Sequence, residues 1–187
     1  MKIAIISDIH NNEVNLKKVL DYCGKNKIEK IICCGDLASR ETLDFLNDNF
    51  AGVIYYTFGN ADYDDLRELE TLKKYRNTFL YKNFGEVEFD ENPVKSADKK
   101  TRKIAFVHFP REAKALAETG KYDFVFYGHT HKPWLSSVKT SASKTETINN
   151  CMMLNPGNAA GEIYPPTFAV WETESGKFEL IRVHEIK

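Results

Sequence analysis

The sequence lacks any long apolar run. None of its uninterrupted apolar stretches approaches the roughly 18 residues that a membrane-spanning helix needs. The N-terminal stretch Met1–Ser7 meets the charged Asp8 and is too short for the core of a secretion signal. We therefore expect a cytoplasmic protein with no membrane partner.

Cysteine motifs and an excess of one charge are also absent. Cys33 and Cys34 are adjacent, Cys23 and Cys151 are isolated, and no CxxC or zinc-knuckle spacing occurs. We expect all four to be small buried apolar residues in a reducing compartment. The 26 basic and 27 acidic residues leave a net charge of −1, which argues against a broadly basic surface for nucleic acid.

What the sequence does contain is a regular alternation of predicted elements within 187 residues, the length of one ordinary domain, 1–187. Short apolar runs rich in β-branched and aromatic residues predict five buried strands: Lys2–Ser7, Lys30–Cys34, Gly52–Phe58, Lys103–Val107 and Tyr122–Tyr127. Helical patterns predict helices at Leu16–Cys23 with a stop at Gly24, Glu41–Leu46, Asp62–Tyr75 and Arg111–Thr119. This alternation favours an α/β domain with a largely parallel central sheet.

The C-terminal third has a different pattern. Thr167–Trp171 and Lys177–Val183 flank a turn and predict a β-hairpin, and two further strands are predicted at Trp134–Val138 and Cys151–Leu154. The polar segments at 90–101 and 139–150 are expected to be surface excursions.

Residues that can bind a metal follow each of the five predicted strands. They are Asp8, His10, Asp36, Asn60, His108, His129 and His131. Because ligand crevices of open α/β sheets lie outside the carboxyl ends of the strands, these side chains are expected to converge. The glycines before Asp36, Asn60 and His129 fit sharp turns in which φ is positive. The remaining histidine, His184, is expected on the surface.

Imidazoles combined with carboxylates and an amide oxygen suit divalent ions such as Mn²⁺, Ni²⁺, Fe, Zn²⁺ or Co²⁺. Each motif alone has a simpler interpretation: Gly35-Asp36 as a turn, Asn60 as a helix cap, and Asn155-Pro156-Gly157-Asn158 as a tight turn. The position of this last segment after an apolar strand leaves a supporting role near the site as an alternative. Asn11 could contact substrate or cap the following helix. The combination of all five strand ends favours a metal centre.

These motifs also carry a family resemblance. Asp8-x-His10, Gly35-Asp36, Gly59-Asn60-x-Asp62, His108 and Gly128-His129-x-His131, in this order, resemble the calcineurin-like metallophosphoesterases. The short length, the Asn155-Pro156-Gly157 turn and the C-terminal hairpin are similar to the small prokaryotic phosphodiesterase branch. The resemblance implies a four-layer α/β/β/α sandwich of two mixed sheets.

The resemblance also implies roles for individual residues. One ion would be held by Asp8, His10, Asp36 and His131, and a second by Asp36, Asn60, His108 and His129. Asp36 would then bridge two ions roughly 3.5–4 Å apart, which can share a hydroxide for in-line attack on phosphorus. Asp36, Asn60 and His108 are the candidate catalytic residues, and Asn11 is the candidate substrate-binding residue. The implied function is a manganese-type phosphodiesterase or phosphatase acting on a small phosphoester.

The sequence departs from the family pattern at two places. Many relatives carry a histidine directly after the asparagine, where it is proposed to protonate the leaving group, and Ala61 cannot do so. A second histidine often follows the one matching His108, whereas Phe109 and Pro110 follow here. Because losing a general acid slows a reaction by about 10²–10⁴-fold, we expect slow turnover rather than none.

These departures keep a rival function open. A catalytically weak or inactive protein-interaction scaffold of the same fold, such as the metal-binding-type retromer subunit, fits Ala61, whereas the complete ligand set argues against it. A nuclease of the same superfamily is disfavoured by the near-neutral charge and the small size. The sequence leaves the substrate and the oligomeric state open.

Overall fold

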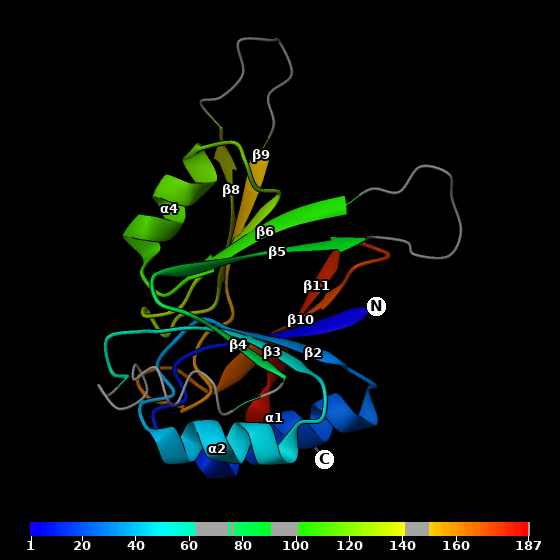
Figure 1. Cartoon of the computed structure of the whole chain (residues 1–187), viewed down its shortest axis with the longest axis vertical. Helices are drawn as coiled ribbons and strands as arrows, with labels where there is room; N and C mark the ends of the chain where they lie inside the picture. Colours follow the sequence, from blue (N-terminus) through cyan, green and yellow to red (C-terminus); the bar gives the residue numbers. More distant parts are fainter. Residues whose placement is uncertain (63–74, 76, 91–100, 141–149, 187) are drawn as a thin grey trace.

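The computed structural model describes residues 1–62, 75, 77–90, 101–140 and 150–186. Two mixed β-sheets pack face to face, with helices on their outer surfaces (Figure 1). In the first sheet the strand order is β11-β10-β1-β2-β3-β4, and in the second it is β5-β6-β7-β9-β8. The two-sheet, four-layer arrangement that the resemblance implies is therefore confirmed.

The first sheet combines four parallel strands with an antiparallel hairpin. The parallel strands are β1 (Lys2–Ile6), β2 (Lys30–Cys33), β3 (Val53–Thr57) and β4 (Thr78–Tyr81). The C-terminal hairpin, β10 (Thr167–Glu172) and β11 (Lys177–Arg182), pairs antiparallel with the free edge of β1. Both halves of this hairpin were predicted from the sequence.

The second sheet has a parallel centre and antiparallel edges. Its strands are β5 (Phe84–Asp90), β6 (Thr101–Val107), β7 (Phe124–Phe126), β8 (Trp134–Lys139) and β9 (Asn150–Asn155). Strands β6, β7 and β9 run parallel, while β5 and β8 close the two edges antiparallel.

The helices lie on the two outer faces. Figure 1 shows α1 (Glu13–Lys25) and α2 (Arg40–Asn49) side by side on the first sheet, and α4 (Pro110–Glu118) against the second. A short 3₁₀ turn, η2 (Val183–Glu185), follows β11. Among the described residues, no helix is long and apolar enough to cross a membrane.

Three separate apolar clusters hold the four layers together. The period-2 alternation of β1 sends Ile3 and Ile5 between the sheets, where they meet Phe106, Phe126 and other aromatic residues of the second sheet. The alternate strand residues Ala4 and Ile6 instead pack under α1 and α2. A third cluster joins α4 to the outer face of the second sheet. Burial of both faces explains why central strands such as β1, β2 and β7 are apolar almost throughout, whereas the edge strands β8 and β11 are largely exposed and carry polar residues.

Several expectations need correction. The chain has two mixed sheets instead of one largely parallel central sheet, and strands β4 and β5 were not predicted. Helix α1 continues through Gly24 to Lys25 and has Asn26 as its C-cap, so Gly24 does not end the helix. Its N-cap is Asn12, whose side chain accepts a hydrogen bond from the Asn15 amide, so Asn11 is not the cap.

Most of the predicted helix at 62–75 lies outside the described residues, as do the central parts of the two predicted surface excursions, 91–100 and 141–149.

Candidate metal centre

All seven predicted ligand residues lie at one end of the sandwich, just after strand ends. The first sheet contributes Asp8 and His10 after β1, Asp36 after β2, and Asn60 after β3. The second sheet contributes His108 after β6, and His129 and His131 after β7. The convergence expected at the carboxyl ends of the strands is thus observed, with both sheets facing one centre.

One group of donors comprises Asp8, His10 and His131. The Nε2 atoms of the two imidazoles lie 3.3 Å apart. Asp8 Oδ1 lies 3.4 Å from the His131 nitrogen and 3.8 Å from the His10 nitrogen. These three ligand atoms fall within 4.8 Å of one another, close enough to hold a metal ion.

A second group lies beside it. His108 Nε2 is 3.2 Å from Asp36 Oδ2 and 3.1 Å from the amide oxygen of Asn60. The same amide oxygen lies 2.9 Å from His129 Nδ1. Asp8 also falls within 4.8 Å of the Asp36 and His108 donors, so the two groups are contiguous.

Asp36 faces both groups with a single oxygen. Its Oδ1 atom accepts a hydrogen bond from the Ala61 amide at 2.8 Å. Its Oδ2 atom lies 3.2 Å from His108 and 3.8 Å from His10, one imidazole of each group. Asp8 Oδ1, in contrast, faces His10 and His131, which both belong to the first group. Asp36 is therefore the carboxylate best placed between the two groups.

The donor chemistry fits a cation. His108 Nδ1 donates its proton to the Cys34 carbonyl oxygen at 2.8 Å, so the ring in its neutral form presents a lone pair at Nε2. That lone pair faces two further electron-rich atoms, the oxygens of Asp36 and Asn60. Such atoms repel unless a positive charge lies between them. Their 3.1–3.2 Å spacing matches donors bound at about 2.0–2.2 Å to one ion, which lie about 3.0–3.5 Å apart.

Electrostatics in the site favour the same conclusion. Burial disfavours the charged form of Asp8, but hydrogen bonds from His10 and His131 outweigh it and hold the pKa well below its usual range. The Asp8 carboxylate in turn raises the pKa of both histidines. Burial lowers the pKa of His108, yet its contact with Asp36 more than compensates and leaves that pKa raised. The buried carboxylates of Asp8 and Asp36 thus stabilise positive charge among the side chains of this site.

Backbone strain is concentrated in the same residues. Five of the seven have a positive φ, namely Asp8 (54°), His10 (45°), Asp36 (59°), His129 (71°) and His131 (58°). Side chains other than glycine rarely adopt this region, at a cost of about 1–3 kcal/mol each. The surrounding hydrogen bonds enforce it, for example from the His129 amide to Asp8 Oδ2 at 3.0 Å. Strain of this kind is typical of functional sites.

Two of the three glycines before the ligands have a different role from the one predicted, whereas the prediction for Gly35 is confirmed. Only Gly35 has a positive φ, 101°, while Gly59 and Gly128 do not. A Cβ atom on Gly59 would lie 2.0 Å from Asp36 Oδ1, and one on Gly128 would lie 1.9 Å from the Ser7 hydroxyl oxygen. These two glycines are required for close approach of neighbouring chain segments, because the turn itself is made at the ligand residues.

Asp62 supports the site, although the sequence marked it only as part of a motif. Its buried carboxylate accepts hydrogen bonds from the backbone amides of Asp36 at 3.1 Å, Ala38 at 2.9 Å and Gly59 at 2.6 Å. These bonds tie the turn after β3 to the turn after β2. Asp62 therefore fixes the backbone that carries Asp36 and Asn60.

The Asn155–Asn158 segment does more than turn the chain. Asn155 donates to the Gly128 carbonyl at 2.8 Å, and Asn158 donates to the His131 carbonyl at 3.2 Å. Both amides thereby hold the loop that carries two imidazoles. The sequence favoured a tight turn here and left this supporting role as an alternative.

The two remaining predictions concern Asn11 and His184. The side-chain oxygen of Asn11, Oδ1, accepts hydrogen bonds from the hydroxyl groups of Ser39 at 2.7 Å and Thr42 at 2.8 Å, at the start of α2. The Asn11 side chain thus links the loop after β1 to that helix beside the metal-binding groups. His184 lies exposed on η2, as expected.

Comparison with known proteins agrees with this geometry. Residues 1–176 match the model of the calcineurin-like phosphoesterase superfamily domain. The phosphodiesterase MJ0936 of Methanocaldococcus jannaschii is 27% identical over 182 residues, covering 97% of this chain and 98% of that protein. The structure of an archaeal phosphodiesterase has a TM-score of 0.78 at 26% identity, covering 97% of this chain and 99% of that one.

A more distant structure shares the fold. Vps29 from Entamoeba histolytica has a TM-score of 0.58 at 18% identity, with 97% of this chain and 99% of that chain covered. The family match over nearly the whole length, together with the ordered motifs and the converging donors, decides the classification. The chain belongs to the calcineurin-like phosphoesterase superfamily.

Proposed function

We propose that this phosphoester hydrolase is a phosphodiesterase that works with two divalent metal ions, Mn²⁺ being the first candidate and Ni²⁺, Fe, Zn²⁺ or Co²⁺ the alternatives. The first ion would bind Asp8, His10, Asp36 and His131. The second would bind Asp36, Asn60, His108 and His129. The observation that carries the proposal is the position of Asp36 Oδ2, which faces His108 at 3.2 Å and His10 at 3.8 Å.

The chemistry follows from what these side chains do. Bound divalent ions neutralise charge on phosphate oxygens and activate water near neutral pH. Asp36, Asn60 and His108 are the groups we assign to catalysis, since their donor atoms meet between the two sheets. The side-chain nitrogen of Asn11, Nδ2, would donate a hydrogen bond to a phosphate oxygen, because the side-chain oxygen Oδ1 already accepts hydrogen bonds from Ser39 and Thr42. No serine or cysteine nucleophile is required.

Diester specificity is supported by two observations. Two relatives that are 27% and 26% identical over 97% of this chain are named phosphodiesterases. Ala61 offers no proton to a departing alcohol, so the site suits small substrates whose leaving group is stable as an anion or takes its proton from water.

The direct test is hydrolysis of bis-p-nitrophenyl phosphate and p-nitrophenyl phosphate with Mn²⁺ or Ni²⁺. We expect faster hydrolysis of the diester, loss of activity on chelation, and loss in Asp36→Ala but not in His184→Ala, which alters an exposed histidine on η2. Absence of metal-stimulated hydrolysis across monoesters, diesters and cyclic nucleotides would refute the proposal.

The rival function is that of a protein-interaction scaffold without catalysis. The fold that this chain shares with Vps29 is the reason to test it. The two functions differ in metal content after purification with metal. A protein that retains metal and hydrolyses phosphoesters is the enzyme, whereas a scaffold would retain no metal in a stoichiometric amount.

A further inference from the structure

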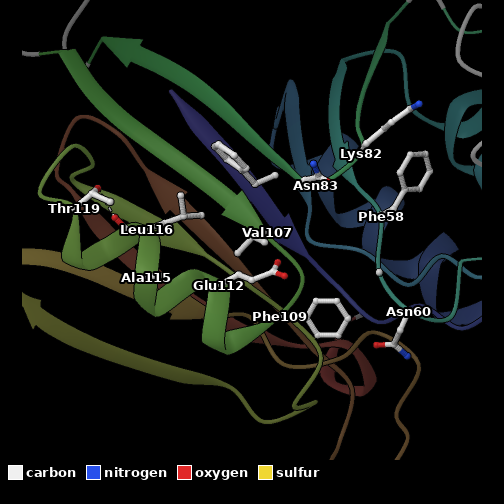
Figure 2. A pocket seen from close by; sticks show the side chains of 12 residues that line it. Phe58, Asn60, Lys82, Asn83, Val107, Phe109, Glu112, Ala115, Leu116 and Thr119 are labelled. Carbon is white, nitrogen blue, oxygen red and sulfur yellow. Dashed lines mark hydrogen bonds between the residues drawn. The ribbon is translucent and has the colours of Figure 1, made fainter.

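A pocket of about 710 Å³ opens directly beside the metal centre. It lies between the turns after β3 and β4, the end of β6 and helix α4 (Figure 2). Gly59 and Asn60 belong to its lining, so the pocket and the predicted ligands share one wall. Its volume is within the range of about 300–1,000 Å³ that small-molecule sites occupy.

The walls of this pocket are aromatic and aliphatic. Phe58, Phe84 and Phe109 line it together with Val107 and Leu116. Figure 2 shows Phe58 across the cavity from α4. The Phe84 side chain is 41% exposed although it is large and apolar. An exposed apolar surface that forms a concavity next to a reactive centre is typical of a binding site.

Phe109 connects this pocket to the metal-binding imidazoles. Its ring centroid lies 4.9 Å from that of His108, at an interplanar angle of 77°, and 4.9 Å from that of His129, at 63°. Phe109 also lines the pocket. A planar group stacked on Phe109 would therefore lie one ring away from a phosphate held at the metal centre.

Among the polar residues that line the pocket, Glu112 supplies a carboxylate and Lys82 an ammonium group, while Asn60, Asn83 and Thr119 can both donate and accept hydrogen bonds. In Figure 2 the Glu112 carboxylate lies beside Phe109 and Val107, inside the cavity. The ammonium group of Lys82 points away from both Glu112 and Phe109 in the same view. A group stacked on Phe109 would therefore meet the Glu112 carboxylate nearby and not the Lys82 ammonium group, which at that position favours a flat ring with an N–H or O–H donor over an anionic group.

We propose that this pocket binds a planar aromatic substituent of the phosphoester, stacked on Phe109 and donating a hydrogen bond to Glu112. The inference rests on the proposed function for its phosphate and names the kind of alcohol that the phosphate carries. A nucleoside and a hydroxylated aryl group share this chemistry, and both classes belong in the test.

Calorimetric titration of the manganese-loaded protein separates the possibilities without turnover. The probes are nucleoside 5′-monophosphates against ribose 5-phosphate, and phenyl phosphate against cyclohexyl phosphate. We expect the aromatic member of each pair to bind about tenfold more tightly, since stacking of one base on an aromatic side chain has an effect of that size or larger. Because the proposed occupant donates a hydrogen bond to Glu112, 3-hydroxyphenyl phosphate represents the hydroxylated aryl class in a second comparison. Tighter binding of nucleotides than of 3-hydroxyphenyl phosphate identifies the nucleoside, and the reverse identifies the hydroxylated aryl group.

Helix α4 offers a matched pair of variants. Ala115 lines the pocket, while the adjacent Lys114 is exposed and does not. Ala115→Trp should fill the cavity and abolish the aromatic preference while leaving ribose 5-phosphate affinity within about twofold. Lys114→Trp should retain the preference. Glu112→Gln should lower the affinity of nucleotides relative to phenyl phosphate, which has no donor on its ring.

Equal affinities within both pairs in the wild type, or a preference that survives Ala115→Trp, would overturn the pocket assignment. Metal-free protein distinguishes this failure from failure of the proposed function. There, adenosine but not ribose should give saturation-transfer NMR signals. If the proposed function is wrong, phosphoester hydrolysis is absent but the NMR signals of adenosine remain. If the pocket assignment is wrong, these signals are absent but bis-p-nitrophenyl phosphate is still hydrolysed.

Discussion

The backbone amide of His129 donates to both carboxylate oxygens of Asp8, at 3.0 Å to Oδ2 and 3.3 Å to Oδ1, across 121 positions of sequence. Asp8 follows a strand of the first sheet and His129 a strand of the second. This contact joins the two halves of the sandwich at the metal centre. Each sheet therefore positions the ligands of the other, and the site depends on the packing of both.

Asp62 should contribute strongly to stability. Replacing it by alanine in Asp62→Ala leaves three buried backbone amides, those of Asp36, Ala38 and Gly59, without their acceptor. We expect the free energy of unfolding to fall by about 3 kcal/mol, measured by urea denaturation. The control Asp21→Ala removes an exposed ion pair with Lys17 on α1 and should change it by less than about 1 kcal/mol. Equal effects of the two substitutions would argue against this role.

Two glycine substitutions should differ in their effects: Gly59→Ala should weaken metal binding, whereas Gly24→Ala should raise stability. In Gly59→Ala the new Cβ would lie 2.0 Å from Asp36 Oδ1, so the carboxylate must move and Mn²⁺ affinity should fall about tenfold or more. In Gly24→Ala the new Cβ meets nothing within 4 Å in the last turn of α1. That variant should gain up to about 1 kcal/mol in stability and bind metal as the wild type does. Unchanged metal affinity in Gly59→Ala would contradict the close packing described for this turn.

Restoring a general acid should change the leaving-group dependence. Ala61 is partly exposed next to Asn60, at the position where many relatives place a histidine. Ala61→His should accelerate hydrolysis of a diester with an alkyl leaving group by about a hundredfold. Hydrolysis of bis-p-nitrophenyl phosphate, whose leaving group is stable as an anion, should change little. The kcat values of the two substrates provide the measurement, and a uniform change in both would show that Ala61 does not occupy the acid position.

The cysteines should be inert in the native protein. All four are buried and free. Burial raises the pKa of Cys23 and Cys151 to about 12, and burial also raises the pKa of Cys33 and Cys34 well above the ordinary value. A thiol reagent such as Ellman's reagent should label none at pH 8 and all four after unfolding. Rapid labelling of the folded protein would contradict their burial.

The same shifts give a pH dependence of stability. Below a pH of about 8.5, the ordinary thiol pKa, both states keep their thiol protons and these groups contribute no dependence. As pH rises beyond that value, only the unfolded chain loses thiol protons, so the free energy of unfolding must fall. Urea denaturation at pH 8 and pH 10, compared with a Cys23→Ala variant, should show the smaller decrease in the variant. An equal decrease would mean that Cys23 titrates alike in both states.

Much of the site could be predicted because its chemistry stands where apolar strands end. Buried strands are short and continuous in the sequence, and a polar residue directly after each is conspicuous. His129 and His131 illustrate this, since two imidazoles after an apolar run have no role in packing. Pairing with distant residues is not visible in this way, so the supporting roles of Asp62, Asn155 and Asn158 depended on the structure.

The missed strands and the misassigned strain have physical causes too. Strand β4 has only four residues, and Phe79 on it is 51% exposed, so its apolar pattern is weak. Strand β5 contains Gly85, which weakens the strand pattern but is needed because a Cβ there would lie 2.0 Å from the Phe106 ring. Positive φ at Asp8 and Asp36 is not readable from sequence, because such residues adopt it only when tertiary hydrogen bonds enforce it.

Metal stoichiometry is the most direct test of the central claim that Asp36 joins two metal positions. Elemental analysis after manganese loading and desalting should give about two ions per chain in the wild type and in His184→Ala. His131→Ala should keep about one, and Asp36→Ala should keep less than one, because it removes a ligand shared by both positions. A wild type that retains one ion or none, or an Asp36→Ala variant that still retains two, would contradict the account.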